Sequence, residues 1–254
     1  GTDCGICQTA AGCPETGKTM RLDKFIADAT AYSRKEIKKL VRYRAVTVNG
    51  EVAVNADRQV NAETDVRING KPIVYRKYIY LMLNKPQGYL SATEDKKYPV
   101  VTELVPENLK HFNVFPVGRL DMDTEGLLLL TNDGQFDHEL MSPNRKVPKL
   151  YYAELDKPAE AADVEAFRAG MKFQDFTAKP ARLEITAEPH KVYIEIAEGK
   201  FHQVKRMCGQ VGREVTFLKR VKIGELPLDE QLKPGEMREL TPEEYALVMG
   251  KKNA

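Results

Sequence analysis

A group of charged residues stands directly before an apolar run in the segment GRLDMDTEGLLLLTNDGQF, residues 118–136. Arg119, Asp121, Asp123 and Glu125 precede four consecutive leucines. Turn-forming residues flank the leucines, and this pattern is typical of a buried strand. A strand backbone is rigid, so side chains at its entrance can be held in a working geometry. The segment is therefore a candidate for catalysis, for ion binding or for a structural salt bridge.

The spacing of the acids can be compared with a calcium loop. DMDTEG places acids at loop positions one, three and five and glycine at position six, but the twelfth position, which requires glutamate, is Asn132. The leucine run also predicts a strand where an EF-hand needs a helix. We therefore reject calcium. A buried salt bridge between Arg119 and one of the acids, with no chemistry of its own, stays open as an alternative to catalysis.

Composition places the chain among globular proteins with one sizeable core and room for a small extra domain. Of its 254 residues, 42% are hydrophobic and 30% are charged. The longest apolar runs are far shorter than the ~20 residues that a membrane-spanning helix needs, and the N-terminus lacks the basic and apolar regions of a signal peptide. We therefore expect a cytoplasmic protein. The net charge is only +2, but basic residues concentrate in two segments, 33–44 and 199–207.

Two motifs in residues 1–19 are interpreted as accidental. The three cysteines of this segment include a C-x2-C pair, but a closed zinc site needs four ligands and the segment has no histidine. GCPETGKT, residues 12–19, matches the phosphate-loop pattern, yet the sequence before it is too polar to be the buried strand that such a loop requires. Met20 followed by an amphipathic pattern suggests a natural start. We predict that residues 1–19 are a disordered tag or a non-native extension.

The next part of the chain predicts two helices and a hairpin. Apolar residues recur at i, i+3, i+4 and i+7 from Leu22 to Ala29, which gives one apolar helical face. Ser33 and Glu36 form a capping box that opens a second helix. VTVNGEVAV, residues 46–54, alternates on both sides of Asn-Gly and predicts a hairpin. In this order of elements, residues 20 to about 68 resemble the S4-like RNA-binding domain.

The polar face of the second predicted helix is almost entirely basic. A solvated surface is one explanation. However, like charges four residues apart oppose helix stability, so a partner with negative charge explains the pattern better. The candidate RNA-binding residues are Arg34, Lys35, Lys38, Lys39, Arg42 and Arg44.

A second core begins after residues 69–77, which we predict to be a polar linker. An apolar strand starts at Tyr78 and is stopped by a proline. Further strands are predicted at KLYYAEL, ARLEIT, KVYIEIAE and EVTFLKRV, and helices at PAEAADVEAFRAGM, around HQVKRMCGQV and at TPEEYALVM. Strands with hairpin-like connections and interspersed helices indicate an α+β fold rather than a doubly wound sheet. The second domain is expected to span residues 78–250, with a tail at 251–254.

Four motifs occur in the order expected of the RsuA group of pseudouridine synthases, which the chain resembles from residue 20 onward. They are LNKPQGYLSAT, GRLDMDTEGLLLLTNDGQFDH, PKLYYAEL and EGKFHQVKRM. The resemblance implies an S4-like domain followed by a synthase domain with a mainly antiparallel mixed sheet and flanking helices. It implies isomerisation of uridine to pseudouridine in ribosomal RNA, without cofactor or metal. Members that modify small-subunit (16S) RNA are the most similar. A large-subunit (23S) target and a non-catalytic RNA-binding assembly factor stay open.

The resemblance also implies roles for four residues. Asp121 of GRLD matches the catalytic aspartate, which acts either as nucleophile or as base. Arg119 matches the arginine that helps to extrude and hold the target nucleotide. Tyr151 matches the tyrosine that packs on the target base. Lys205 of HQVK matches the basic residue that pairs with the aspartate.

This reaction makes physical sense of the charged segment. Breaking a glycosidic bond calls for a carboxylate beside the sugar, and rejoining the base requires that water be kept out. We expect the apolar strand at residues 127–130 to wall the site, and Asp123 and Glu125 to serve loop structure or to face solvent. The expected partner is ribosomal RNA or a pre-ribosomal small-subunit particle, bound by a monomer that does not associate with membranes.

Overall fold

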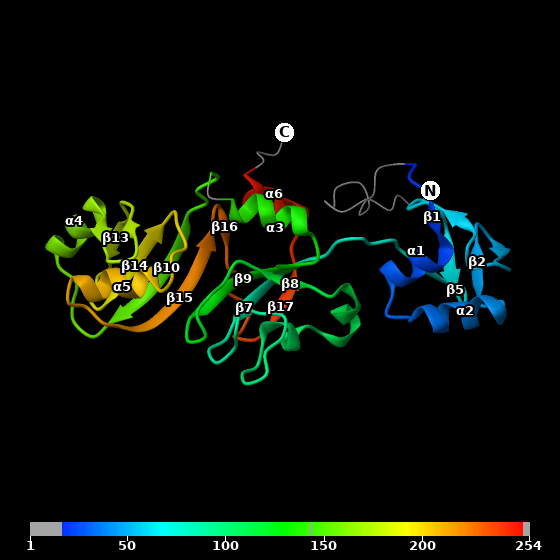
Figure 1. Ribbon diagram of the computed structural model, residues 1–254, viewed down its shortest axis with the longest axis horizontal. Coiled ribbons are helices and arrows are strands. Elements are labelled where there is room, and N and C mark those ends of the chain that lie inside the picture. The colour runs from blue at the N-terminus through cyan, green and yellow to red at the C-terminus, as the bar shows by residue number, and fades with distance from the viewer. Residues whose placement is uncertain (1–16, 143, 251–254) are drawn as a thin grey trace. The chain divides into compact units, whose positions relative to one another are not determined.

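The computed structural model describes residues 17–142 and 144–250, which form two compact units (Figure 1). The first unit comprises the described residues up to Ile79 together with Val105–Val114, and the second comprises Tyr80–Leu104 and the residues from Phe115 onward. Within the described ranges, no helix is long and apolar enough to cross a membrane. The cysteine motif, and the phosphate-loop motif up to residue 16, lie outside the described residues.

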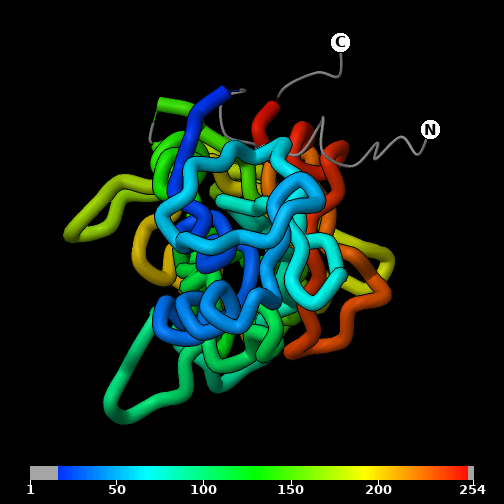
Figure 2. The backbone as a smooth tube through the Cα atoms, turned by 90° about the vertical axis from the view of Figure 1, so that its right-hand side faces the viewer, coloured from blue at the N-terminus to red at the C-terminus, as the bar shows by residue number. Residues whose placement is uncertain are grey.

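The first unit combines two helices with short strands. Helices α1 (Leu22–Ala29) and α2 (Arg34–Arg42) lie side by side and are drawn in blue (Figures 1 and 2). The strands are β1 (Met20–Arg21) paired with β4 (Gln59–Val60), and a four-stranded sheet in the order β3 (Glu51–Val52), β2 (Val46–Val48), β5 (Val66–Ile68) and β6 (Lys71–Ile73).

Local sequence signals of the first unit are confirmed. Ser33 and Glu36 form both hydrogen bonds of a capping box at the start of α2. Asn49 and Gly50 have φ values of 51° and 83° and connect β2 to β3. Two consecutive positive φ values are what a tight type I′ hairpin needs, and Asn-Gly supplies them at the lowest cost. The backbone of this hairpin therefore follows directly from its sequence.

The linker predicted at residues 69–77 is partly wrong. Lys71–Ile73 forms β6, which pairs with β5 at the edge of the sheet. Pro72 lies inside this strand. Proline is tolerated at a sheet edge, because the ladder there does not need its missing N–H group. The first unit consequently extends beyond the hairpin core.

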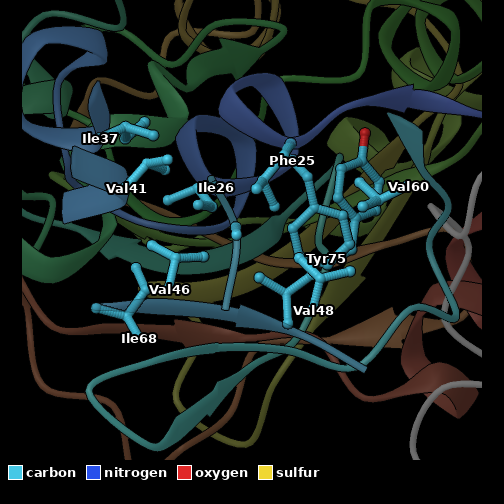
Figure 3. Packing of buried hydrophobic residues seen from close by; sticks show 12 residues of the cluster. Phe25, Ile26, Ile37, Val41, Val46, Val48, Val60, Ile68 and Tyr75 are labelled. Carbon is cyan, nitrogen blue, oxygen red and sulfur yellow. The ribbon is translucent and has the colours of Figure 1, made fainter. Parts of the chain in front are cut away.

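The core of the first unit lies between the helices and the sheet. Phe25 and Ile26 of α1 and Ile37 of α2 are fully buried, and Phe25 packs against Tyr75 with ring centroids 5.2 Å apart. Figure 3 shows these side chains meeting valines of the sheet, including Val48. Because α2 buries only this apolar stripe, its basic residues are left on the exposed side.

The second unit is built on one nine-stranded sheet. Its main order is β13 (Arg182–Ile185), β14 (Lys191–Ile196), β10 (Lys149–Leu155), β15 (Val215–Ile223), β9 (Glu125–Thr131), β7 (Tyr80–Lys85) and β17 (Met237–Glu239), with β16 (Leu226–Pro227) beside β15 and β8 (Phe115–Val117) beside β9. Only the β15–β9 pair is parallel among these strands. The predicted α+β class with a mainly antiparallel mixed sheet is confirmed.

Four helices accompany the sheet. They are α3 (Gly134–Met141), α4 (Ala161–Ala169), α5 (Gln203–Gln210) and α6 (Pro242–Met249). A hairpin of β11 (Met171–Lys172) and β12 (Thr177–Ala178) and the 3-10 helices η1 (Val101–Leu104) and η2 (Glu107–Phe112) complete the described elements. Thr241 caps α6 and forms a capping box with Glu244. The predicted positions of α4, α5 and α6 agree with these bounds.

The four leucines of the opening segment are central core residues. Leu127 to Leu130 belong to β9 and are at most 1% exposed, since this strand is covered on both faces. Gly126 directly precedes the leucines and has a φ of 106°. A Cβ atom added to it would clash with the carbonyl oxygen of Arg220. Glycine therefore allows β9 to approach β15 in parallel. This pairing fixes the end of the charged loop that precedes the strand.

Candidate active site

One pocket of the second unit brings together all four predicted catalytic residues. Arg119, Asp121, Tyr151 and Lys205 line a small pocket with a volume of about 70 Å³. The first two belong to the loop before β9, whereas Tyr151 lies on β10 and Lys205 on α5. Residues far apart in sequence thus converge on one place. Such convergence is expected of a site and not of a salt bridge confined to one loop.

The apolar wall of the pocket differs from the expectation. It is formed by Leu120, Ile196, Val204 and Leu218. The run at residues 127–130 is absent from the residues that line this pocket, because both faces of β9 are occupied by core packing. The prediction that the leucine run walls the site is therefore wrong. An apolar wall exists, but the loop before β9, the strands β14 and β15 and helix α5 supply it.

Two carboxylates share the ammonium group of Lys205. Its Nζ atom lies 3.1 Å from Oδ2 of Asp121 and 2.6 Å from Oδ1 of Asp123. The side chain of Asp121 is 27% exposed and that of Asp123 is 69% exposed. Asp121 also contacts His202, whose Nε2 atom lies 3.5 Å from Oδ1 of Asp121. Asp121 is thus the more buried carboxylate and the one that faces both basic side chains.

The pKa values of Asp123 and Lys205 follow from their contact with each other. Burial acts to raise the pKa of Asp123, but the hydrogen bond and charge of Lys205 outweigh it and lower this pKa below its usual value. Burial acts to lower the pKa of Lys205, but its hydrogen bonds to Asp123 and Asp121 raise this pKa. Lys205 therefore stays charged at neutral pH. Its positive charge favours the ionised form of Asp123.

Lys85 anchors the loop that carries Asp121. It is fully buried at the end of β7, and its Nζ atom lies within hydrogen-bond distance of four carbonyl oxygens. These belong to Pro86 at 3.0 Å, Asp121 at 3.0 Å, Met122 at 3.2 Å and Thr124 at 2.9 Å. Burial lowers the pKa of Lys85 to about 8, although the nearby carboxylates oppose this shift. A single buried cation thus ties the backbone of Asp121, Met122 and Thr124 to the end of β7.

Ser91 holds the other end of the same loop. Its hydroxyl donates to the carbonyl oxygen of Leu120 and accepts from the Leu120 N–H, both at 3.0 Å. The N–H of Gly88 donates to the carbonyl of Met122 at 2.8 Å. The segment LNKPQGYLSAT is therefore the scaffold of the GRLD loop. The roles of Lys85 and Ser91 were not among the predictions. A lysine that ends a fully apolar strand was the signal in the sequence that could have indicated the role of Lys85.

The two neighbouring tyrosines of β10 point to opposite faces of the sheet. Tyr151 is 8% exposed and lines the pocket. Tyr152 instead packs with Tyr193 and Phe217, at centroid distances of 5.7 Å and 6.2 Å. Burial and a hydrogen bond to Glu154 raise the pKa of Tyr152 to about 12. The alternation of a strand therefore leaves Tyr151 as the aromatic residue available to a bound base.

The first unit carries a separate basic groove with a volume of about 500 Å³. Lys38, Arg42 and Arg44 line it together with Arg21 and the segment 53–57. The other candidates on α2, namely Arg34, Lys35 and Lys39, are exposed but do not line this groove. In the part of the chain that the structure describes, none of the six predicted residues forms a salt bridge. Their charges are therefore available to an anionic ligand.

Residues 17–142 and 144–250 contain no group of three or more His, Cys, Asp or Glu side chains that could hold a metal ion.

The chain is similar to known proteins over most of its length. Residues 79–210 match the family described as RNA pseudouridylate synthase, and residues 20–66 match the S4 domain. A protein of Bacillus subtilis (strain 168) named "Uncharacterized RNA pseudouridine synthase YtzG" is 45% identical over 234 residues, which cover 90% of this chain and 98% of that protein. The chain belongs to the RNA pseudouridylate synthase family. The resemblance drawn from the four motifs is thereby confirmed.

Two further relatives are informative. The "Ribosomal small subunit pseudouridine synthase A" of Escherichia coli (strain K12) is 42% identical over 234 residues, covering 91% of this chain and all of that protein. A solved structure titled "Crystal structure of pseudouridylate synthase" is 37% identical, with a TM-score of 0.64, and covers 90% of this chain and 99% of that chain. The similarity extends over both units.

Proposed function

We propose that the protein isomerises a specific uridine of small-subunit (16S) ribosomal RNA to pseudouridine, with Asp121 as the catalytic group. The observation that carries this proposal is the convergence of Arg119, Asp121, Tyr151 and Lys205 on one pocket. The name of the Escherichia coli relative, which is similar over its whole length, supports the small subunit as the target.

The reaction breaks the bond between ribose C1′ and N1 of uracil and forms a bond between C1′ and C5. A proton leaves C5 and a proton is gained at N1, so the product is an isomer. Asp121 would attack the ribose or remove one of its protons, and the ammonium group of Lys205, 3.1 Å away, would hold this carboxylate in place. The apolar wall keeps water away while the base is detached.

Two other side chains would hold the target nucleotide. Arg119 is exposed where it lines the pocket, so it can reach into the RNA and take the place of the extruded nucleotide. Tyr151 offers an aromatic surface inside the pocket on which uracil can pack. Extrusion is required because the reacting atoms are inaccessible in a stacked base.

The first unit would supply affinity. The basic residues of α2 contact phosphates, which positions the RNA but carries little sequence information. The substrate is ribosomal RNA or a pre-ribosomal small-subunit particle, and the protein acts on it as a monomer in the cytoplasm.

Mapping of pseudouridines tests the proposal. Ribosomal RNA is compared between cells with the protein, cells without it, and cells that carry only Asp121→Asn. One small-subunit pseudouridine should be lost without the protein and should not be restored by the variant. Loss of a large-subunit pseudouridine would move the target to 23S RNA. Unchanged pseudouridines with defective ribosome assembly would indicate a non-catalytic assembly factor.

A further inference from the structure

Phe201 presents an exposed aromatic ring beside the catalytic pocket. It is 73% exposed and stacks on His202, with ring centroids 3.8 Å apart and an angle of 17° between the planes. Single exposed apolar side chains are ordinary on protein surfaces. This one differs in its neighbour, because His202 lines the pocket and lies 3.5 Å from Asp121. The stacked pair therefore runs from the catalytic carboxylate out to solvent.

The turn that carries Phe201 is held in place by Gln203, which is 3% exposed. The side-chain oxygen of Gln203 accepts from the N–H of Lys200 at 3.1 Å, and its amide nitrogen donates to Oε2 of Glu198 at 2.9 Å. The same carboxylate oxygen accepts from the N–H of Lys179 at 2.9 Å. A buried amide thus fixes the turn from two sides.

His202 also has an uncommon backbone conformation. Its φ of 49° and ψ of 31° lie in the left-handed region, which residues other than glycine rarely adopt. Such conformations persist where the surroundings enforce them, and they concentrate at functional sites. Here the conformation starts α5 and lets Phe201 stack on the next residue along the chain. The exposed aromatic face is held in position before any ligand arrives, which lowers the entropy lost on binding.

We propose that Phe201, backed by His202, stacks on the nucleobase adjacent to the target uridine. This inference rests on the proposed function. Extrusion of one nucleotide leaves its neighbour with an unpartnered face, and aromatic side chains are the usual partners of unstacked bases in RNA. Lys200 precedes Phe201 and is exposed, so it is available to the phosphate that joins the two nucleotides. Because every base has an aromatic face, the contact holds the strand without selecting its sequence.

Four variants separate stacking from other roles. Phe201→Ala should raise KM for small-subunit ribosomal RNA by about 10- to 100-fold, as expected for the loss of one stacked base, and should leave kcat nearly unchanged. Phe201→Trp should restore KM, whereas Phe201→Leu, which is apolar without an aromatic face, should not. Leu247→Ala removes another exposed apolar side chain, 42% exposed on α6, and should behave as the parent. A fall in kcat at unchanged KM would instead mean that Phe201 acts by positioning His202, and would overturn the inference.

A second measurement identifies the stacked base. The substrate is prepared with an abasic nucleotide on the 5′ or the 3′ side of the modified uridine. With the abasic nucleotide on one of the two sides, the parent should bind the RNA more weakly than it binds intact RNA. Phe201→Ala should bind this abasic RNA no more weakly than it binds intact RNA, because the abasic nucleotide and the substitution remove the same contact. If the abasic nucleotide and Phe201→Ala weakened binding independently of each other on both sides, the inference would be overturned. Turnover by the parent would still support the proposed function. Absence of turnover by the parent would count against the proposed function itself.

Discussion

The Nζ atom of Lys205 lies 3.1 Å from Oδ2 of Asp121, although the two residues are carried by different elements of the second unit. Lys205 projects from α5 and Asp121 from the loop before β9. Both side chains are mostly shielded, with 23% and 27% of their surfaces exposed. An ion pair with this degree of burial is screened by salt less than a fully exposed pair.

Removal of the cation at position 205 should slow the chemical step. Lys205→Met keeps the length of the side chain but removes the ammonium group that lies 3.1 Å from Oδ2 of Asp121. We expect kcat to fall by about 100-fold, in line with other losses of one electrostatic partner at a reaction centre. Lys205→Arg should retain more activity because it preserves the charge. Lys222→Met is the control, since Lys222 pairs with Glu225 at the surface. An unchanged kcat in Lys205→Met would contradict the pairing role.

Replacement of the buried Lys85 should destabilise the loop at residues 119–124. Lys85→Met removes the only charged group of that side chain and leaves four carbonyl oxygens without its donor. We expect a loss of about 2–4 kcal/mol in the free energy of unfolding, because each of these carbonyls loses a hydrogen bond to a charged donor in a buried place. Urea unfolding measures this loss, and hydrogen exchange should report faster opening of residues 119–124. Lys96→Met, at an exposed position, should change neither quantity. Equal stability of the two variants would contradict the anchoring role.

The effect of Lys85 should depend on pH in a defined direction. Its pKa is about 8 in the folded protein, against 10.5 for the unperturbed group. Between these values the unfolded chain binds more protons, so the contribution of Lys85 to the free energy of unfolding rises as pH increases from 8 to 10.5. The difference in unfolding free energy between the parent and Lys85→Met should grow by about 1–3 kcal/mol across this window. A shrinking difference would mean that the carbonyl oxygens raise the pKa of Lys85 instead.

The basic face of α2 should control salt-dependent binding. Replacement of Arg34, Lys38 and Arg42 by alanine should weaken RNA binding and reduce the slope of log K against log salt by about 2–3, because each phosphate contact contributes about one unit. The matched control removes three cations that each have an acidic partner, namely Lys24, Arg58 and Arg67. It should leave most of the slope intact. Equal slopes for both triple variants would mean that the basic face of α2 is an ordinary solvated surface that does not contact RNA.

Local patterns predicted much of this fold because their causes are local. The capping box at Ser33, the Asn49-Gly50 turn and the apolar run of β9 each follow from a few adjacent residues. The role of Lys85 could not be predicted in this way, because three of its four carbonyl partners lie in a loop more distant along the chain. β6 was missed because whether Pro72 is tolerated depends on its edge position, which only the assembled sheet defines.

In the candidate site, too, some features could be predicted from the sequence and others depend on the folded chain. The motifs, through the family resemblance, pointed to Arg119, Asp121, Tyr151 and Lys205, and the structure brings these residues to one pocket. The apolar wall was assigned to the wrong residues, because a leucine run does not reveal that both faces of its strand are covered. The second ion pair of Lys205, with Asp123 at 2.6 Å, was likewise missed, since α5 and this loop meet only in three dimensions.

The role of Asp121 can be tested most directly by the release of tritium from C5-labelled uridine in ribosomal RNA. Asp121→Asn keeps the shape of the side chain but removes its charge and nucleophile, so turnover should be abolished while folding and RNA binding persist. Asp123→Asn, at a mostly exposed side chain, and Glu125→Gln should each retain most of the parent's turnover at matched concentration of folded protein. Substantial tritium release by Asp121→Asn, or loss of release only in the other two variants, would contradict the assignment of Asp121 as the catalytic carboxylate.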